Sequence, residues 1–391
     1  MGYIADKFEE ENPNVSVKLV TVSQEQKNGS NLSVLASASP PDVGVVPVNS
    51  EAFTQLTRAD ALADLSAVWK NSDLDERYGD AGSALKVSGV PYVATVTSVG
   101  YNVVFYNPAL FERVGIDAPE NHRFTSVDQL VDAAERLREA GLGPMQIGGS
   151  SGYEASWMID AMLPTIATGE QMANYLSSFN PDVKATAKYT DPAFEKTLES
   201  IDKLAKSGVF QDGFLGQDSA IAKGPFVQGF AGMALGATAS LASFEDAAFT
   251  PAWALLPPMD DDATTQISMY FGDAIGIPAQ AKEKEWAEKF VEFVLSDRMQ
   301  EEAIIGAGAA LPSVNSLSEE ALAKLPDLSK EFLADIKENG SQPGWTASVP
   351  GGFGQQFIDP LMQQMFAGDL TPDEVAAKQQ AHLLETRENA G

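Results

Sequence analysis

Cysteine is absent from all 391 residues of the chain. Without thiols, the chain forms no disulfide, no thiolate zinc site and no cysteine nucleophile. Histidine is nearly absent as well, because only His122 and His382 occur. Few residues are therefore available for a catalytic or metal site built on histidine. We expect neither a cofactor nor a bound metal.

Basic residues are scarce. Lysine and arginine together number 26 against 55 aspartates and glutamates, which gives a formal net charge of -29. A surface with this charge repels phosphate backbones and anionic lipids. Nucleic acid is therefore not expected as a partner, and the acidity is interpreted as a solubility feature or an adaptation to salt.

Long apolar runs and common catalytic motifs are also missing. No run reaches the roughly 18 to 20 residues that a membrane span requires. The chain has no G-x-S-x-G elbow and no phosphate-binding G-x-x-x-x-G-K-(S/T) loop. The triple Asp260-Asp261-Asp262 lacks the spaced ligands and closing glutamate of an EF-hand loop, so we interpret it as a solvated turn.

The length of the chain predicts two domains. A single hydrophobic core stops growing at roughly 250 to 300 residues, and this chain is longer. Its apolar fraction of 44% and charged fraction of 21% are ordinary for a globular protein. Strand-like and helix-like segments alternate along it, which predicts an α/β architecture with largely parallel sheets and ligand contacts on the loops that follow strands.

The stretch from Gly89 to Pro119 is the most informative in the sequence. Residues 99–106 supply the β-branched and aromatic side chains of a buried strand. Asn107 and Pro108 stop this strand and begin a short amphipathic helix, which ends at Gly115. The pattern predicts a strand that leaves one domain and brings the chain to a second one.

This stretch resembles the extracytoplasmic solute-binding proteins that feed carbohydrate ABC transporters, namely the extracellular solute-binding protein family 1, which is similar to maltose-binding protein. The family carries a Y-N-x-x-L-F-x-x-x-G-(I/L)-x-x-P segment just past its first hinge crossing. The matching residues here are Tyr106, Asn107, Leu110, Phe111, Gly115, Ile116 and Pro119. Looser similarities recur in order along the chain, at residues 41–43, 224–236, 283–295 and 309–314.

The resemblance implies a two-lobed, type II periplasmic-binding-protein-like α/β fold. Each lobe would be a sheet flanked by helices, and three hinge crossings would join the lobes. The expected N-terminal lobe comprises residues 1–106 and 273–313, and the expected C-terminal lobe comprises 107–272 and 314–391. The second and third crossings are expected at Tyr270 to Pro278 and at Ala309 to Val314.

The resemblance also implies a function. A protein of this family captures a sugar or oligosaccharide in its interlobe cleft by hinge closure, delivers it to a membrane permease and catalyses no reaction. We accordingly expect an extracytoplasmic monomer, either periplasmic or anchored to the cell surface as a lipoprotein. The chain as given opens on a helical segment, Tyr3 to Glu10, so the export signal and the first strand that the family implies are absent from it.

Aromatic residues on loops are the first candidates for ligand contact, because sugar C–H groups pack on flat apolar faces. Trp157 follows a glycine-rich loop after a predicted strand, and Trp345 lies in an irregular polar segment. Tyr153 and Phe353 are further candidates on loops. The other three tryptophans have core periodicity, and they are Trp69, Trp253 and Trp286.

Polar candidates lie at predicted strand ends and in the loop before Trp157, where they could bond to sugar hydroxyls. For each one, a helix cap, a hinge hydrogen bond or a solvated loop is the alternative interpretation. The set comprises Asn49, Ser50, Glu51, Thr95, Thr97, Glu154, Thr238, Ser240 and Asp273.

Two other functions stay open at this stage. The first is a secreted glycan-active hydrolase, in which paired carboxylates such as Glu51 and Asp273 serve as acid and base. The second is a binding protein for an amino acid, a polyamine or a metal. The acidic residues keep a polyamine ligand open, whereas the adjacent tyrosines that iron capture prefers are missing.

Overall fold

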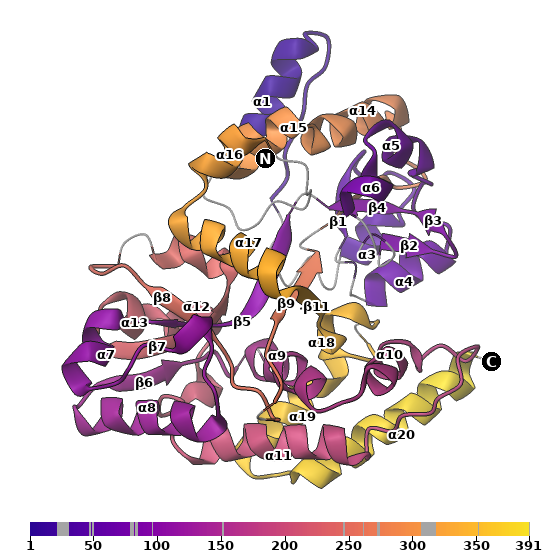
Figure 1. Cartoon of the computed structure of the whole chain (residues 1–391). Coiled ribbons are helices and arrows are strands. Elements are labelled where there is room, and N and C mark those ends of the chain that lie inside the picture. The colour runs from indigo at the N-terminus through magenta and orange to yellow at the C-terminus, as the bar shows by residue number, and fades with distance from the viewer. Residues whose placement is uncertain are drawn as a thin grey trace. The chain divides into compact units, whose positions relative to one another are not determined.

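A computed structural model describes residues 1–21, 31–46, 48, 51–78, 82, 85–95, 97–150, 152–244, 247–260, 262–271, 274–305, 318–350 and 352–390. For residues 31, 51, 52, 242, 271, 304, 305 and 390 the description is of the backbone alone. Figure 1 shows the elements in chain order.

The residues group into two compact units by their internal contacts. Unit 1 comprises residues 1–99 and 271–333, and unit 2 comprises 100–270 and 334–391, so the chain passes from one unit to the other three times. The third crossing expected at Ala309 to Val314 lies outside the described residues. The third boundary between the two units lies between Leu333 and Ala334, inside helix α17 (Asp327–Asn339).

Unit 1 is built around a small antiparallel sheet. Its described strands β1 (Gly44–Val46), β10 (Ala274–Gly276) and β4 (Val93–Thr95) pair in that order, with Ile275 opposite both Val45 and Ala94. The other elements are α1 (Gly2–Glu11), α3 (Asn31–Leu35), α4 (Glu51–Arg58), α5 (Ser66–Asn71), α6 (Leu74–Tyr78), β2 (Lys86–Val87), β3 (Val90–Pro91), α14 (Lys284–Leu295), α15 (Asp297–Met299), the π-helix η6 (Gln300–Ile305) and α16 (Glu319–Lys324).

Aromatic packing joins α1 and α14 within the core of unit 1. The Phe8 ring lies edge-on to Trp286, Phe290 and Phe293, with centroid distances of 6.4, 5.2 and 5.3 Å. Trp69 on α5 is also buried, and its indole N–H donates to the Val93 carbonyl at 3.0 Å. The prediction that Trp69 is a core residue is therefore confirmed, and Trp286 packs against the same core while remaining partly exposed.

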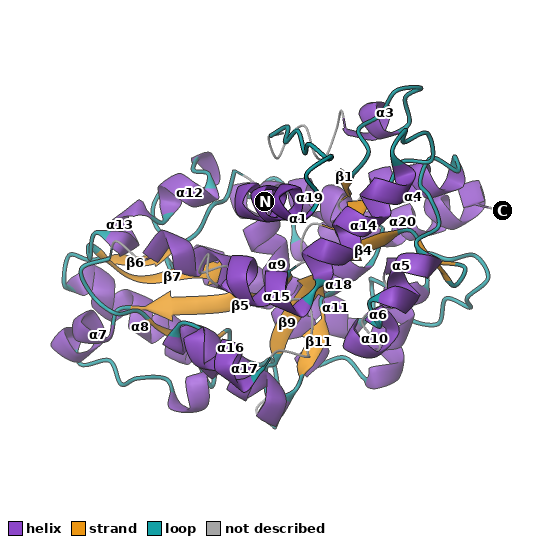
Figure 2. Ribbon diagram, turned by 90° about the horizontal axis from the view of Figure 1, so that it is seen from above, coloured by secondary structure: helices purple, strands orange, loops and turns teal. Residues whose placement is uncertain are grey.

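The described strands of unit 2 form a six-stranded mixed sheet. The order is β11 (Ser341–Pro343), β9 (Ile267–Phe271), β5 (Ser98–Tyr106), β7 (Ala231–Ala237) and β6 (Gly143–Gln146), and β8 (Ala252–Leu255) also pairs with β5. Figure 2 shows β6, β7 and β5 side by side. The buried Trp253 lies on β8 and stacks on His122, which confirms that this tryptophan is a core residue.

The expectation of largely parallel sheets is wrong for the described strands. In unit 2, β6 with β7 and β9 with β11 are parallel, whereas β5 is antiparallel to both β7 and β8. Parallel neighbours need a helical crossover, and helices do separate β6 from β7 along the chain. β5 arrives from unit 1 without such a crossover, and it joins the sheet of unit 2 even though the expected boundary assigned it to the N-terminal lobe.

Helices cover the sheet of unit 2. Figure 1 shows α8 (Val127–Glu139) running along β6, and α11 (Pro192–Lys206) beside α20 (Pro372–Ala390). The remaining elements are α7 (Pro108–Val114), η2 (Glu120–His122), α9 (Tyr153–Met162), η3 (Leu163–Thr165), α10 (Gly169–Ser177), η4 (Phe214–Gly216), α12 (Ser219–Ala222), α13 (Gly224–Val227), η5 (Thr238–Phe244), α18 (Trp345–Ser348) and α19 (Gln355–Ala367).

The break after β5 forms as the sequence predicts. The Asn107 side chain accepts the N–H groups of Ala109 and Leu110, and Pro108 occupies the first helical turn of α7. Gly115 ends the helix with a φ of 72°, a conformation that glycine adopts without strain. Local capping rules therefore suffice to place this helix.

No strand forms in residues 15–21, although the apolar Val15, Val17 and Leu19 after the Asn12-Pro13 break are typical of one, and residues 22–30 lie outside the described part of the chain. The Val17 N–H donates to the Glu9 carboxylate at 2.6 Å, and the Val15 N–H donates to the Asn12 carbonyl at 2.8 Å. Both donors are thus used within the turn that follows α1. Among the helices described, we find none both long and apolar enough for a membrane span.

Candidate functional site

Four aromatic rings of unit 2 pack one against the next, and we call them the aromatic row. Tyr153 lies 4.9 Å from Trp157, Trp157 lies 5.1 Å from Tyr101, and Tyr101 lies 5.5 Å from Tyr270, measured between ring centroids. Tyr101 is fully buried, whereas the other three rings are partly exposed. The row therefore offers aromatic surface to solvent and keeps its third ring inside the protein.

The elements of unit 2 bring these rings together. Tyr153 and Trp157 are four residues apart on α9, so they share one face of that helix. Tyr101 and Tyr270 lie on the neighbouring strands β5 and β9. The pairing of β5 with β7 shifts register between Tyr101 and Val103, where Asn102 has a φ of 70°, and a bulge of this kind re-aims the side chains beside it.

The hydroxyl of Tyr101 is anchored to a buried carboxylate. It donates to Asp160 Oδ2 at 2.8 Å, the Thr346 N–H donates to Asp160 Oδ1 at 2.9 Å, and the Thr346 hydroxyl also donates to Oδ2. Burial raises the pKa of Asp160 to about 6, although these hydrogen bonds oppose the rise. Burial, with Asp160 nearby, also raises the pKa of Tyr101 well above its usual value, so its hydroxyl keeps its proton.

A second carboxylate lies behind the start of α9. Asp359 on α19 packs against Gly152, where an added Cβ would lie 2.7 Å from the Asp359 Cβ. Its Oδ1 is buried and has no hydrogen-bond partner among the described residues. Burial raises the pKa of Asp359 to about 7, and the charge of Asp160 adds to the rise. Sequence reasoning did not select either aspartate.

Glu154 was expected to contact a ligand, and the structure corrects this. Its side chain is buried, and it accepts the Gly148 N–H at 2.5 Å together with the Ser219 hydroxyl and the Lys223 ammonium. A carboxylate with these partners is already satisfied. Glu154 therefore holds the glycine-rich loop before α9 in place. The sequence gives no local sign of Lys223, which lies 69 residues further along the chain.

Trp345 and Phe353 are also core residues, which corrects the expectation that they contact a ligand. Their exposed fractions are 0% and 2%. The Trp345 indole N–H donates to the Tyr189 hydroxyl at 3.0 Å, and its ring packs against Tyr189 and Phe194 at 5.4 and 5.7 Å. The irregular, polar sequence around Trp345 concealed this, because α18 is only four residues long.

Two polar candidates of unit 2 stabilise the turn after β7. The Thr238 hydroxyl accepts the Gly100 N–H at 3.1 Å, and the Ser240 hydroxyl accepts the Ala237 N–H at 3.2 Å. Thr238 is buried, and Ser240 is partly exposed. These bonds fix the loop beside β5.

The polar candidates of unit 1 are described only in part. Thr95 is buried, its hydroxyl donates to the Thr97 carbonyl at 2.9 Å, and its backbone carbonyl accepts the Tyr78 hydroxyl at 2.8 Å. Thr97 is partly exposed. The remaining candidates are Asn49, Ser50 and Asp273, which lie outside the described residues, and Glu51, which begins α4 without a described side chain.

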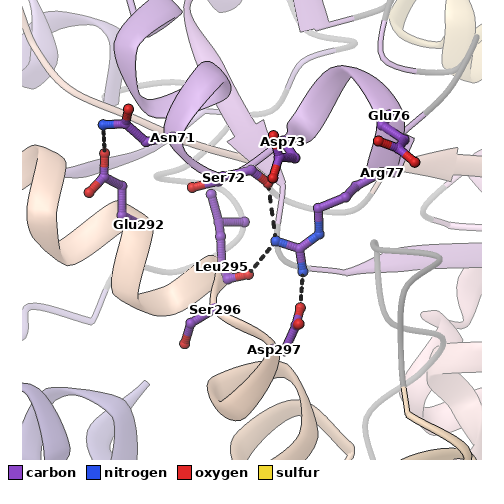
Figure 3. Close-up of a pocket in the computed structure, with 9 residues that line it drawn as sticks. All are labelled: Asn71, Ser72, Asp73, Glu76, Arg77, Glu292, Leu295, Ser296 and Asp297. Atoms are coloured by element: carbon purple, nitrogen blue, oxygen red, sulfur yellow. Dashed lines mark hydrogen bonds and ion pairs between the residues drawn. The ribbon is translucent and has the colours of Figure 1, made fainter.

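Unit 1 also has a surface pocket of about 600 Å³ between α5–α6 and α14–α15. Figure 3 shows Arg77 at its centre, donating to the carbonyls of Ser72 and Leu295 and to Asp297 Oδ1 at 2.7 Å. Asn71 donates to Glu292 across the same pocket. No aromatic side chain lines it, and its arginine already ties the helices together. Within the described part of the chain, no three metal-ligating side chains gather into a possible metal site.

The fold is similar to that of solved binding proteins. A chitin oligosaccharide binding protein matches with a TM-score of 0.82 and 21% identity over 100% of this chain and 95% of its own. The GacH receptor of Streptomyces glaucescens, solved without ligand and with acarbose, matches with a TM-score of 0.80 and 19% identity over 100% and 95%. At these identities the likeness establishes the fold alone, and it confirms the solute-binding-protein architecture predicted from the sequence.

Sequence comparison gives a relative and a family. An uncharacterised ABC transporter extracellular-binding protein of Pyrococcus horikoshii is 26% identical over 209 residues, which cover 52% of this chain and 44% of that protein. The chain thus matches less than half the length of this relative. The family model for bacterial extracellular solute-binding proteins matches residues 1–301. Because this match spans most of the chain, the protein belongs to the bacterial extracellular solute-binding protein family.

Proposed function

We propose that the protein captures a sugar or oligosaccharide outside the cytoplasm and delivers it to an ABC transporter permease. The observation that carries the sugar assignment is the aromatic row, in which Tyr153, Trp157 and Tyr270 are all partly exposed. Membership of an extracellular solute-binding family supports the location and the transport role. Action as a monomer and closure of the two lobes on the ligand are parts of the same proposal.

The chemistry of the row suits a carbohydrate. Sugar rings present C–H groups that pack on aromatic faces, while their hydroxyls need donors and acceptors at the edge of those faces. Tyrosine supplies a face and a hydroxyl in the same side chain. Burial, followed by the charge of Glu154, raises the pKa of Tyr153, so its hydroxyl stays protonated and able to donate at neutral pH.

The similar structures support the same class of ligand. One is named as a chitin oligosaccharide binding protein, and a solute-binding protein from Thermotoga lettingae was solved with α-D-tagatose. The latter matches with a TM-score of 0.80 and 18% identity over 99% of this chain and 95% of its own. These ligands belong to those proteins, and for this chain they suggest which sugars to test first.

The proposal can be tested by isothermal titration calorimetry against monosaccharides and oligosaccharides. We expect at least one sugar to bind the wild-type protein, and Trp157→Ala to weaken that binding by about tenfold or more, which is about 1.4 kcal/mol. The matched control is Trp286→Ala, because Trp286 is also partly exposed but lies in unit 1 against Phe8.

Two outcomes would contradict the proposal. Failure of every sugar to bind the wild-type protein would remove the carbohydrate assignment. Chromatography of the incubated sugars provides the second check, because a transport protein returns its ligand intact. Release of shorter products would instead favour the glycan hydrolase that the sequence left open.

A further inference from the structure

The buried third ring of the aromatic row, Tyr101, cannot itself contact a ligand. Tyr101 is fully buried, yet the partly exposed rings of Trp157 and Tyr270 both pack against it, at 5.1 and 5.5 Å. A ring that supports two others determines the distance between them. The position of Tyr101 therefore sets the spacing of the two exposed faces on either side.

Asp160 connects all three elements that carry these rings. Its carboxylate accepts the Tyr101 hydroxyl of β5, and it lies on α9 only three residues after Trp157. Its backbone carbonyl accepts the hydroxyl of Ser268 at 3.2 Å, and Ser268 is two residues before Tyr270 on β9. One residue thus fixes α9, β5 and β9 relative to one another at the point where the row forms.

The neighbouring backbone allows this contact only because residue 344 is glycine. A Cβ on Gly344 would lie 1.5 Å from the Tyr101 hydroxyl oxygen and 2.6 Å from Asp160 Oδ2. Its φ of -73° is available to any residue, so space and not backbone conformation requires the glycine here. A side chain at this position would push the Tyr101 hydroxyl away from Asp160.

The polar partners of Asp160 also suit a carboxylate better than an amide. Its two oxygens accept three donors, namely the Tyr101 hydroxyl, the Thr346 hydroxyl and the Thr346 N–H. An amide would replace one of these oxygens by an NH₂ group, which cannot accept a hydrogen bond. Asparagine at residue 160 therefore keeps the shape of the side chain and loses part of the anchor.

We infer that Asp160 and Gly344 are positioning residues that hold Tyr101 in place and thereby set the separation of Trp157 and Tyr270, on which the choice of sugar depends. The part about sugar choice rests on the proposed function. The part about ring positions does not, because it follows from contacts within unit 2.

The ring positions can be measured without any ligand. The protein would be labelled with 5-fluorotryptophan, and the ¹⁹F resonance of Trp157 assigned with Trp157→Phe. We expect Tyr101→Phe, Gly344→Ala and Asp160→Asn each to move the Trp157 resonance while those of Trp69 and Trp286, in unit 1, stay in place. The matched control is Gly216→Ala, since an added Cβ at Gly216 meets nothing within 4 Å.

Affinity supplies the second readout. For two sugars that bind the wild-type protein, we expect Tyr101→Phe to change the ratio of their dissociation constants by at least about threefold. A Trp157 resonance that stays in place in Tyr101→Phe would overturn the inference, and so would equal shifts of the Trp69 resonance, because they would indicate a general loss of structure. If Gly344→Ala does not fold, the position of the Trp157 resonance in Tyr101→Phe still tests the inference. If no sugar binds, the proposed function fails while the ¹⁹F result still tests the ring positions.

Discussion

Two of the aromatic clusters in unit 2 differ in the partners of their polar atoms and in the exposure of their rings. In the aromatic row, the Tyr101 hydroxyl bonds to the Asp160 carboxylate, and three of four rings reach solvent. In the second cluster, which we call the core cluster, Trp345 packs with Tyr189, Phe194 and Phe353, and all four rings are buried. The same residue types therefore serve as a surface in one place and as packing in the other.

The difference lies in the partners of the aromatic side chains. The core cluster satisfies its indole N–H internally, through the neutral Tyr189 hydroxyl. The buried Asp160 supports the row, the largely buried Asp359 packs beside the start of α9, and the loop that precedes α9 is held by the pair of Glu154 and Lys223. Polar contacts of this kind contribute less to the free energy of unfolding than apolar packing does. They nevertheless hold partly exposed rings in defined positions.

The largest expected effect distinguishes Trp345 of the core cluster from Trp157 of the aromatic row. Trp345→Ala should lower the free energy of unfolding by about 3–5 kcal/mol, because it removes a fully buried ring and leaves a cavity. Urea titration followed by circular dichroism measures this change. The comparison between clusters breaks down if Trp157→Ala proves equally destabilising.

The next effect tests the polar support of the row. Lys223→Met should cost about 3 kcal/mol, because it leaves the buried Glu154 carboxylate without its cation. Lys203→Met is the matched control, since the Lys203 pair with Asp128 is exposed and should be worth less than about 0.5 kcal/mol. Chemical denaturation of both variants gives the difference in the free energy of unfolding. Equal losses would show that the buried pair of Glu154 and Lys223 stabilises the protein no more than the exposed pair does.

The stability of the folded protein should depend on pH because of Asp359. Its pKa is raised from 3.8 to about 7, so ionisation opposes folding, and stability falls as the pH rises from about 4 through 7. Such a shift corresponds to at most about 4 kcal/mol, which partial exposure of the side chain reduces to about 2 kcal/mol.

Asp359→Asn should therefore stabilise the protein at pH 8 and leave it nearly unchanged at pH 4. Thermal unfolding across this range measures the effect. Asp117→Asn is the control, because it removes the same charge from an exposed residue. Parallel stability curves for wild-type protein and Asp359→Asn would contradict the assignment of a buried, ionising Asp359.

The smallest expected change in stability belongs to the row itself. Trp157→Ala should lower the free energy of unfolding by less than about 1.5 kcal/mol, because this residue is only partly buried before any ligand binds. The same urea titration used for Trp345→Ala measures it. A larger loss would mean that Trp157 acts as a core residue. The aromatic row and the core cluster would then differ less in what their tryptophans contribute to stability.

The sequence predicted features that depend on neighbouring residues. The helix after Asn107 and the strand before it follow from capping and β-propensity, and both form as predicted. Trp157 was selected because it follows a glycine-rich loop, and it does become a partly exposed member of the row.

Features that depend on distant residues were missed. Asp160 meets Tyr101 across 59 positions and Thr346 across 186, and no local pattern indicates either contact. The exposure of Trp345 was misjudged for the same reason, because its burial depends on Tyr189, which is 156 residues away. The polar candidates Asn49, Ser50 and Asp273 stay predictions, since they lie outside the described residues.

The shared support of Trp157 and Tyr270 has a consequence for ligand size. Ordering a mobile side chain on binding costs about 0.5–1.5 kcal/mol. Because Trp157 and Tyr270 both pack on one anchored tyrosine, both rings are held in place before a ligand binds. On the proposed function, a sugar chain long enough to contact both rings avoids this cost at each of them, so a disaccharide should gain more affinity from the second ring than a mobile ring would provide.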